Sequence, residues 1–258
     1  MFFQNIELIK YPNSKERVVF QCDEFYFKHY GFYNLLSCDQ FNQDVHIHFI
    51  NVSNNFLQNI LDLKLSIDLS ISLEILNTDI NFYKLKSYYF TSRYFIADYL
   101  FDKNLLDKAY IIDADIIFNE KISIQNSKLG VLYYPNFENN LWKQTGANFL
   151  FVSKDRKDFL KKIITEYNSR LPQIDFDSIH EKMPKYERSN MYALDQVCMS
   201  IAMQSENTES PDFLNLNEIE KFLGNKDMTC KIWSLTAKKN DATAKILLDR
   251  FKKTFPLT

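Results

Sequence analysis

Short apolar runs alternate with stretches in which apolar residues recur every three or four positions. Short runs are typical of strands, and the recurring spacing is typical of helices. The runs predict strands over residues 17–22, 44–50, 69–76, 109–112, 128–134 and 147–152. The helical spacing predicts helices over residues 27–38, 82–100, 159–167 and 194–201. Strands and helices alternate over the first 110 residues, which predicts βαβ units and an α/β fold with a mostly parallel sheet.

This pattern weakens after Ser205. Residues 205–217 predict a loop that passes into a short strand, and residues 240–255 predict a helix with basic residues beside apolar ones. A basic amphipathic helix can contact an anionic membrane surface. A solvated helix that packs one apolar stripe on the domain explains the same pattern. We predict a single domain over residues 1–258, with 205–258 as a C-terminal extension packed on the rest.

The composition is that of a folded chain. Of the 258 residues, 46% are hydrophobic, 25% are charged and 16% are aromatic, which allows a large core. The chain has 31 Lys and Arg against 33 Asp and Glu, a net charge of -2. Nucleic-acid binding through bulk positive charge is therefore not expected. With only 4 glycines, the chain has no Gly-rich phosphate loop.

The sequence contains no recognisable secretory or membrane-spanning segment. No basic residue precedes the first apolar stretch, and Glu7 interrupts it. No window offers the roughly 18 uncharged apolar residues that a membrane helix needs. The four cysteines, Cys22, Cys38, Cys198 and Cys230, form no CxxC pair, so free thiols in a reducing compartment are expected. We therefore predict a cytoplasmic protein, with the basic C-terminal helix as its candidate membrane contact.

Two aspartates interrupt an otherwise apolar run at residues 109–118. In extended backbone, Asp113 and Asp115 point to the same side, with the small Ala114 between them. Two ionised carboxylates in apolar surroundings are costly unless they bind a cation. Mn²⁺ or Mg²⁺ suits such oxygen ligands. The run therefore predicts a divalent-cation site at the carboxyl end of a strand, in preference to a turn capped by Asp113 with Asp115 exposed.

The order of motifs resembles the GT-A-fold glycosyltransferases of family eight, the glycogenin and bacterial lipopolysaccharide galactosyltransferase type. That family places an Arg in a helix before a strand that ends in an Asp-x-Asp motif, here Arg93 and Asp113-Ala-Asp115. The matching segments are residues 18–26, 92–100, 107–118, 145–152 and 193–196. The resemblance spans roughly residues 17–204 in the family's order, and it implies the GT-A, Rossmann-like fold.

The resemblance implies a nucleotide-binding role for several residues. Cys22, Asp23 and Tyr26 correspond to the segment that contacts the base, and Tyr26 is implied to stack on uracil. Arg93 is implied to neutralise phosphate or to hold the first aspartate of the motif in place. Asn148 is implied to bind a hydroxyl of the donor sugar.

The resemblance also implies the metal and catalytic residues. Asp113 is implied to reach both the ribose and the metal, and Asp115 to bind the metal, which is Mn²⁺ or Mg²⁺. Asp195 and Gln196 are implied to line the reacting face of the donor sugar and are the expected catalytic residues.

The C-terminal motif departs from the family pattern His-x-x-Gly-x-x-Lys. Ser234 stands in place of the metal-binding His, and Ala237 stands in place of the Gly. Lys238 and Lys239 lie within two positions of the Lys that holds the diphosphate. A serine hydroxyl is a weak ligand, so two aspartates, diphosphate and water are expected to hold the metal together with Ser234.

The implied activity is metal-dependent transfer of a sugar from a nucleoside diphosphate sugar, a UDP-sugar, to an acceptor hydroxyl, with retention of configuration. The implied acceptor is a glycan or a lipid-linked molecule. Ser234 motivates an alternative, a degenerate protein that binds a nucleotide sugar or a partner without turnover. A nucleotidyltransferase ranks last, because residues 21–26 lack the Gly-rich, basic loop usual in that class.

Simpler roles are open for the same residues. Asp23 follows a strand and is equally well placed to cap the next helix. Tyr26 is one of 15 tyrosines and fits core packing, while Arg93 fits a surface ion pair. Asp195 and Gln196 lie off the apolar stripe of their helix, so a solvated face explains them too.

Two histidines form a further pattern. His46 and His48 share one face of a predicted strand. Two histidines without a third ligand indicate surface residues more often than a zinc site. No Ser-His-Asp or Cys-His arrangement stands out, so nucleophilic hydrolysis has no support in the sequence.

Overall fold

The computed structural model describes residues 5–76, 80–137, 140–180, 182–224, 230–234 and 249. Within these residues eight strands form one sheet. They are β1 (Ile6–Lys10), β2 (Glu16–Cys22), β3 (Val45–Ile50), β4 (Leu69–Glu74), β5 (Lys108–Ile112), β7 (Leu129–Tyr133), β8 (Thr145–Ser153) and β9 (Phe213–Asn215). A smaller sheet contains β6 (Ile116–Phe118), β10 (Leu223–Gly224) and β11 (Ile232–Ser234).

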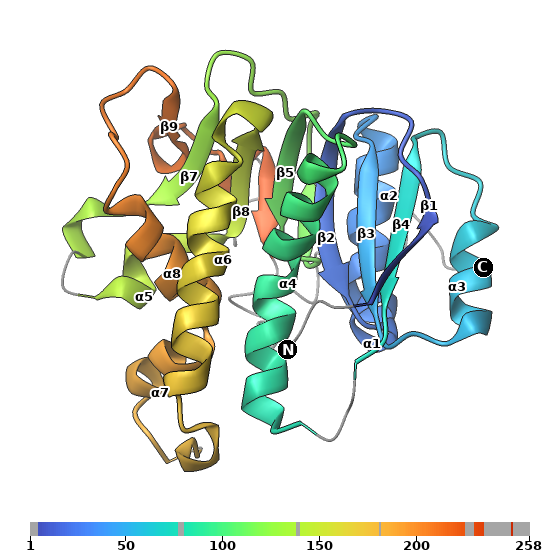
Figure 1. The fold of residues 1–258 in the computed structure, drawn as a ribbon. Coiled ribbons are helices and arrows are strands. Elements are labelled where there is room, and N and C mark those ends of the chain that lie inside the picture. The colour runs from blue at the N-terminus through green and yellow to red at the C-terminus, as the bar shows by residue number, and fades with distance from the viewer. Residues whose placement is uncertain are drawn as a thin grey trace.

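The main sheet has the order β1-β4-β3-β2-β5-β8-β7-β9 (Figure 1). Its centre, β4-β3-β2-β5, is parallel. The strands β8 and β7 follow in antiparallel pairings, and β1 is antiparallel on the β4 edge. The predicted α/β fold with a mostly parallel, mixed sheet is confirmed. Because the central strands run the same way, their carboxyl ends meet at one edge of the sheet.

Helices cover both faces of the main sheet (Figure 1). The α-helices are α1 (Glu24–Tyr26), α2 (Phe32–Gln40), α3 (Asn54–Leu61), α4 (Phe82–Asp102), α5 (Leu141–Gln144), α6 (Asp158–Arg170), α7 (Lys185–Tyr192) and α8 (Leu194–Met203). A π-helical turn, Phe27–Gly31, joins α1 to α2. The 3₁₀ turns are Pro135–Phe137, Lys154–Arg156, Leu171–Gln173, Phe176–Ser178 and Leu216–Glu218.

Two hydrophobic clusters hold the layers together. Val18 and Phe20 of β2 pack in a cluster with α2 and α3, while Val19 packs in a cluster with α4, α6 and α8. Both faces of β2 are therefore buried, and this explains its continuous apolar sequence.

The helix starts are capped by polar side chains. The side chains of Asp23, Ser53 and Asn81 accept hydrogen bonds from backbone N–H groups in the first turns of α1, α3 and α4. These bonds satisfy donors that have no partner inside a helix. The predicted capping role of Asp23 is therefore present in the fold.

Within the described residues, the predicted strands and helices all appear, with ends shifted by a few residues. The predicted helix over residues 27–38 differs in beginning with a π-helical turn, where Gly31 lies against Phe27. A Cβ on Gly31 would lie 2.9 Å from Phe27 Cδ2, so this close approach requires glycine. The sequence patterns did not identify the strands β1, β6, β10 and β11 or the helices α3, α5 and α7.

The C-terminal region contributes to both sheets. The predicted loop and short strand over residues 205–217 are confirmed, and β9 pairs with β7 at the edge of the main sheet. The strand β11 pairs with β10 and β6. The predicted basic helix over residues 240–255 and residues 1–4 lie outside the described residues, and the single-domain boundary stays a prediction. Among the described helices, none is long and apolar enough to span a bilayer.

The predicted surface position of the two strand histidines is wrong. His46 is 0% exposed, and its Nδ1 and Nε2 atoms each lie 2.9 Å from a hydroxyl oxygen, of Ser70 and Ser72 respectively. His48 is equally buried, with Nδ1 2.8 Å from Ser72 Oγ and Nε2 3.3 Å from Glu74 Oε2. The neighbouring strand β4 places these partners opposite the two rings. Their hydrogen bonds offset the free-energy cost of burying the polar ring nitrogens.

The four cysteines are free thiols, as predicted, and the structure buries all four. Burial raises the pKa of Cys22, with a further contribution from the charge of Asp23. The Cys22 side chain belongs to the core cluster that contains Phe20.

Candidate functional site

The predicted site residues gather at the carboxyl ends of β2 and β5. These strands are parallel neighbours, with Val19 opposite Ile111. Asp23 follows β2, and Asp113 follows β5, so both aspartates lie at the same edge of the sheet. Asp23 Oδ1 accepts a hydrogen bond of 2.7 Å from the N–H of Tyr26. Its implied contact with a nucleotide base stays a prediction.

The Asp-x-Asp motif forms a turn, so the predicted extended geometry of Asp113 and Asp115 is wrong. The backbone N–H of Ile116 donates to Asp113 O at 3.2 Å. The chain leaves the main sheet after Ile112, and β6 pairs with β11 of the smaller sheet instead. The two carboxylates are therefore brought to one place by a turn between two sheets, and not by the alternation of a single strand.

Arg93 of α4 joins three segments that are far apart in the sequence. Its Nη1 atom donates to Asp113 Oδ1, and its Nη2 atom donates to Asp195 Oδ2 at 2.8 Å and to Ala147 O at 2.9 Å. Arg93 is 1% exposed, so the simpler interpretation as a surface ion pair is wrong. A buried guanidinium with two carboxylate partners fixes the relative positions of α4, the β5–β6 turn and α8.

Asp195 lies at the start of α8 and is 5% exposed, so it does not lie on a solvated face. Burial raises the pKa of Asp195, and the adjacent positive charge of Arg93 opposes that shift. Gln196 is half-buried, and its Nε2 atom donates to Thr145 O at 3.0 Å. This bond ties α8 to β8. The implied catalytic roles of Asp195 and Gln196 stay predictions.

Tyr26 contacts the second aspartate of the motif. Its hydroxyl donates to Asp115 Oδ2 at 2.7 Å, and Asp115 is 1% exposed. Burial raises the pKa of Tyr26, and the charge of Asp115 raises it further. The phenol therefore stays protonated and donates to the carboxylate. This contact was not predicted from the sequence, and the implied stacking of Tyr26 on uracil stays a prediction.

The remaining predicted residues occupy different surroundings. Because the Cys22 side chain is in the core, a contact with a base would have to come from its backbone. Asn148 of β8 is half-buried, and its carbonyl accepts from the N–H of Asp113 at 3.2 Å. Its implied contact with a sugar hydroxyl stays a prediction. Lys238 and Lys239 lie outside the described residues.

A bulge in β8 places carbonyl groups next to the site. In the β7–β8 pairing, Val131 lies opposite Leu150, but the next residue, Leu132, lies opposite Gly146. The skipped residues are 147–149. Their position agrees with the backbone bonds that Ala147 O and Asn148 O accept from Arg93 and Asp113. Bulges of this kind redirect backbone groups near functional sites.

The chemistry of the donor set fits a divalent cation. Ser234, at the end of β11, lies opposite Ile116, the residue that follows Asp115 in the chain. Arg93 pairs with the carboxylates of Asp113 and Asp195, whereas the carboxylate of Asp115 accepts from the Tyr26 hydroxyl. Two carboxylates and a hydroxyl are the oxygen ligands that Mn²⁺ or Mg²⁺ accepts, with diphosphate and water completing the shell. Within the described ranges, no three His, Cys, Asp or Glu side chains cluster to hold a metal.

Two tyrosines of α4, Tyr89 and Tyr94, lie near Asp23 and Arg93 respectively. The sequence analysis did not identify either tyrosine as a site residue. Tyr94 OH accepts from Arg93 Nη2 at 3.3 Å. Burial, with the nearby charge of Asp23, raises the pKa of Tyr89 to about 12. Tyr89 is four residues before Arg93, and that helical spacing is the signal that places it on the same face.

Comparison with known proteins supports the fold. No protein-family model matches the chain, and no curated protein matches its sequence. The apo-form of glycosyltransferase GlyE from Streptococcus pneumoniae TIGR4 matches at 15% identity with a TM-score of 0.50, over 95% of this chain and 52% of that chain. A second GlyE structure from the same organism matches at 12% identity with a TM-score of 0.53, over 94% of this chain and 64% of that chain.

The chain therefore spans between 52% and 64% of the length of these GlyE chains. Identity this low is evidence for the fold and not for a shared substrate. The resemblance to family eight stays a prediction. The described part of the chain shares the fold of the matched part of the glycosyltransferase GlyE.

Proposed function

We propose that this protein is a glycosyltransferase that moves a sugar from a UDP-sugar to an acceptor hydroxyl, using Mn²⁺ or Mg²⁺. The observation that carries the proposal is the convergence of Arg93, Asp113, Asp115 and Asp195 at the carboxyl edge of the central strands. Open α/β sheets bind ligands at this edge. The fold, shared with glycosyltransferase GlyE, supports the same reaction class.

The proposed mechanism assigns the metal to Asp113 and Asp115, with Ser234 as a weak third ligand. A bound divalent cation supplies charge that offsets the negative charge growing on the leaving diphosphate. Arg93 would hold Asp113 in position, and the phenol of Tyr26 would do the same for Asp115. Preorganised ligands of this kind need no rearrangement during the reaction.

Asp195 is proposed to face the reacting carbon of the donor sugar, with its carboxylate fixed by Arg93. Retention of configuration is proposed to follow a front-face route, in which an oxygen of the departing diphosphate takes the proton of the acceptor hydroxyl. The C1–O bond to diphosphate breaks as the bond to the acceptor oxygen forms on the same face. The proposed acceptor is a glycan or a lipid-linked molecule, and membrane contact through the basic C-terminal segment is part of the same proposal.

Thermal unfolding with nucleotides tests the donor site. The wild-type protein is heated with UDP, GDP and CDP, each with and without Mn²⁺. A ligand at 100 times its Kd stabilises the native state by about 2.7 kcal/mol. For a chain of 258 residues this corresponds to a rise in Tm of about 5 °C. We expect this rise with UDP and Mn²⁺ together.

The matched variants are Asp115→Ala at the site and Asp102→Ala on the surface. Asp102 is an exposed aspartate paired with Lys157 and Lys161, away from the motif. The rise in Tm should disappear in Asp115→Ala and persist in Asp102→Ala. A full metal-dependent rise in Asp115→Ala, or transfer activity that survives in it, would remove the proposed metal site.

Binding without turnover is the second candidate function. The observation that favours it is Ser234, which lies opposite Ile116, next to the motif, at the position where the resemblance implies a metal-binding His. Release of UDP from UDP-sugars by the purified protein would exclude this alternative. Nucleotide binding with no release of UDP from any donor, in the presence of Mn²⁺, would favour it over the enzyme.

A further inference from the structure

The first turn of α8 contains Asp195 and Gln196, the two residues implied to line the reacting face of the donor sugar. Ala193 ends α7 and also precedes α8, and its methyl side chain cannot cap the new helix. The first backbone N–H groups of a helix have no partners inside the helix. Fixing the start of α8 against the sheet therefore depends on contacts from other elements.

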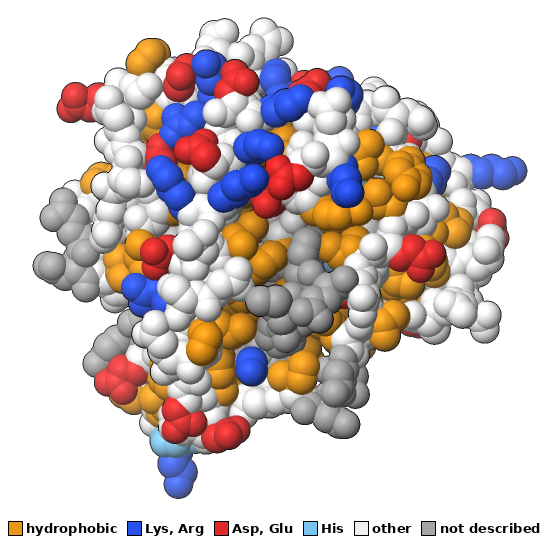
Figure 2. All heavy atoms as spheres, in the orientation of Figure 1, with side chains coloured by type: hydrophobic (Ala, Val, Ile, Leu, Met, Phe, Trp, Pro, Cys, Tyr) orange, Lys and Arg blue, Asp and Glu red, His pale blue; other side chains and the backbone are white. Residues whose placement is uncertain are grey.

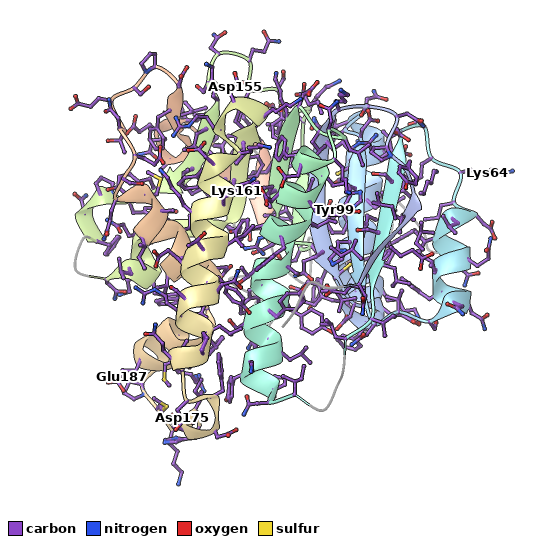
Figure 3. All side chains as sticks on the ribbon, in the orientation of Figure 1. Lys64, Tyr99, Asp155, Lys161, Asp175 and Glu187 are labelled. Carbon is purple, nitrogen blue, oxygen red and sulfur yellow. The ribbon has the colours of Figure 1, made fainter. Side chains whose placement is uncertain are left out.

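The two ends of the helical layer formed by α4, α6 and α8 are held differently. At the end of α4, Asp102 Oδ1 lies 2.7 Å from Lys157 Nζ and 3.2 Å from Lys161 Nζ (Figure 3). Figure 2 shows that charged side chains gather over this upper end of the layer. Exposed ion pairs contribute little to stability, because water screens them. The other end of the layer, where α7 meets α8, is held by buried hydrogen bonds.

Thr145, the first residue of β8, makes two of these buried bonds with Gln196. Its Oγ1 atom donates to Gln196 O at 3.1 Å, and Gln196 Nε2 donates to Thr145 O at 3.0 Å. Thr145 is 1% exposed, so water does not compete for these groups. The two bonds run in opposite directions, and together they fix both the backbone and the side chain of Gln196.

The Thr145 hydroxyl reaches a second residue of α8, one helical turn further on. Its Oγ1 atom lies 3.0 Å from Ser200 Oγ, and Ser200 Oγ donates to Leu141 O of α5 at 2.6 Å. Gln196 and Ser200 are four residues apart and therefore lie on one face of the helix. Contacts at two points on one face restrain α8 from rotating about its axis, and that rotation is the motion that would displace Asp195 and Gln196.

The strand β8 also holds the other half of the candidate site. Ala147 O accepts from Arg93 Nη2 at 2.9 Å, and Asn148 O accepts from the N–H of Asp113 at 3.2 Å. One strand therefore positions the guanidinium and the motif through its bulge, and Gln196 through Thr145. A change at Thr145 alone would shift the start of α8 relative to the motif and leave the bulge contacts in place.

We propose that Thr145 is a positioning residue for sugar transfer, acting through Gln196 on the reacting face of the donor sugar. The inference rests on the proposed glycosyltransferase function. Because Thr145 is buried, its effect passes through Gln196 and not through contact with the sugar. Misplacement of reacting groups by about 1 Å can lower a rate by about 100-fold. The proposed metal ligands lie on other elements, so the binding of UDP with Mn²⁺ is expected to be independent of Thr145.

Steady-state release of UDP tests the proposal, with UDP-glucose, UDP-galactose and UDP-N-acetylglucosamine as donors in the presence of Mn²⁺. Valine has nearly the shape of threonine without the hydroxyl, and serine keeps the hydroxyl. We expect Thr145→Val to lower kcat at least about tenfold and to change KM less than about twofold. Thr145→Ser should retain kcat within about threefold of the wild-type value. Thermal unfolding shows whether each variant is folded at the assay temperature.

The matched control is Thr91→Val, the same substitution at a second buried threonine. Thr91 is 0% exposed, and its Oγ1 atom donates to Ser87 O at 3.0 Å within α4. Its kcat should equal that of the wild type. An equal loss of kcat in Thr91→Val would show a general effect of removing a buried hydroxyl and would overturn the proposal.

Isothermal titration calorimetry supplies a second readout that does not require turnover. The ratio of the Kd for UDP to the Kd for a UDP-sugar, both with Mn²⁺, measures the contribution of the sugar contacts. Thr145→Val should lower this ratio and leave the Kd for UDP unchanged. If the wild type binds UDP-sugars without releasing UDP, the ratio alone decides.

The outcomes separate this inference from the proposed function. A wild-type kcat and an unchanged ratio in Thr145→Val would overturn the positioning role, as would a Thr145→Ser variant as impaired as Thr145→Val. In these cases UDP binding with Mn²⁺ in the wild type would leave the proposed function standing. Failure of the wild type to bind UDP or any of the three donors with Mn²⁺ would overturn the proposed function and this inference together.

Discussion

Acidification below about pH 6.5 is expected to destabilise the fold through His46. Both ring nitrogens of His46 contact hydroxyl groups in a fully buried site. Burial holds the pKa of His46 well below its usual 6.5, and the neighbouring His48 and Arg17 lower it further. The folded protein therefore keeps this ring neutral at pH values where an unfolded chain protonates it.

The sign of the effect follows from proton counting. Below pH 6.5 the unfolded state binds one more proton than the native state at this position, so the free energy of unfolding falls as the pH falls. The limiting slope is about 1.4 kcal/mol per pH unit, until the pH reaches the lowered pKa of the folded protein. Between neutral pH and pH 5.0 the loss amounts to about 2 kcal/mol. For 258 residues this lowers Tm by about 4 °C.

Urea unfolding followed by circular dichroism between pH 5 and pH 8 measures this slope. The informative comparison is His46→Gln, which keeps an amide for hydrogen bonding but does not titrate. The slope of its free energy of unfolding against pH should be smaller than that of the wild type, and the difference should correspond to nearly one bound proton. His29→Gln, at an exposed position, is the control and should keep the wild-type slope. Equal slopes in wild type and His46→Gln would refute the reasoning.

Three further predictions follow from the site. Replacing Arg93 by Met removes the cation that pairs with the buried carboxylate of Asp195 and with the half-buried carboxylate of Asp113, and should cost about 3–5 kcal/mol in urea unfolding; a loss below about 1 kcal/mol would contradict a buried Arg93–Asp195 ion pair. Tyr26→Phe removes the donor to Asp115 and should lower stability by about 1–3 kcal/mol, with the apparent Mn²⁺ affinity as a second readout. Unchanged values of both would argue against the contact. In Gly146→Ala, the new Cβ would lie 3.1 Å from Leu132 Cβ, and a loss of about 1–3 kcal/mol is expected by calorimetry; wild-type stability would show that the bulge adapts.

The sequence predicted the strands well because burial on both faces produces long apolar runs. Residues 109–112 are an example, since β5 is enclosed by strands on both sides and by helices. The sequence also predicted the Asp-x-Asp motif as a site, but it did not predict that the motif forms a turn. Nothing in the residues 113–118 indicates that β6 pairs with β11, whose partner residues lie more than a hundred positions away.

Long-range partners explain the other failures. Arg93 lies in a segment whose apolar spacing predicts a helix. Asp195 lies 102 positions further along the chain, so no local pattern indicates that the two side chains pair. His46 stands at an alternating polar position that is usually exposed. The register of β3 against β4 places Ser70 directly opposite His46, and that register depends on tertiary packing.

The π-helical turn at Phe27–Gly31 acts as a phase shift between two helices. A π turn holds one more residue than an α turn, and each residue of an α-helix rotates the chain by about 100°. An α turn covers the same rotation with one residue fewer, so deleting one residue here would restore a continuous α-helix and leave α1 and α2 in their present relative orientation. If all the present residues were wound as one α-helix instead, α1 would rotate by roughly 100° relative to α2, and the Tyr26 hydroxyl would turn away from Asp115. The direction in which this phenol points is thus encoded in a residue count, because the π turn accommodates one extra residue without rotating Tyr26 away from the motif.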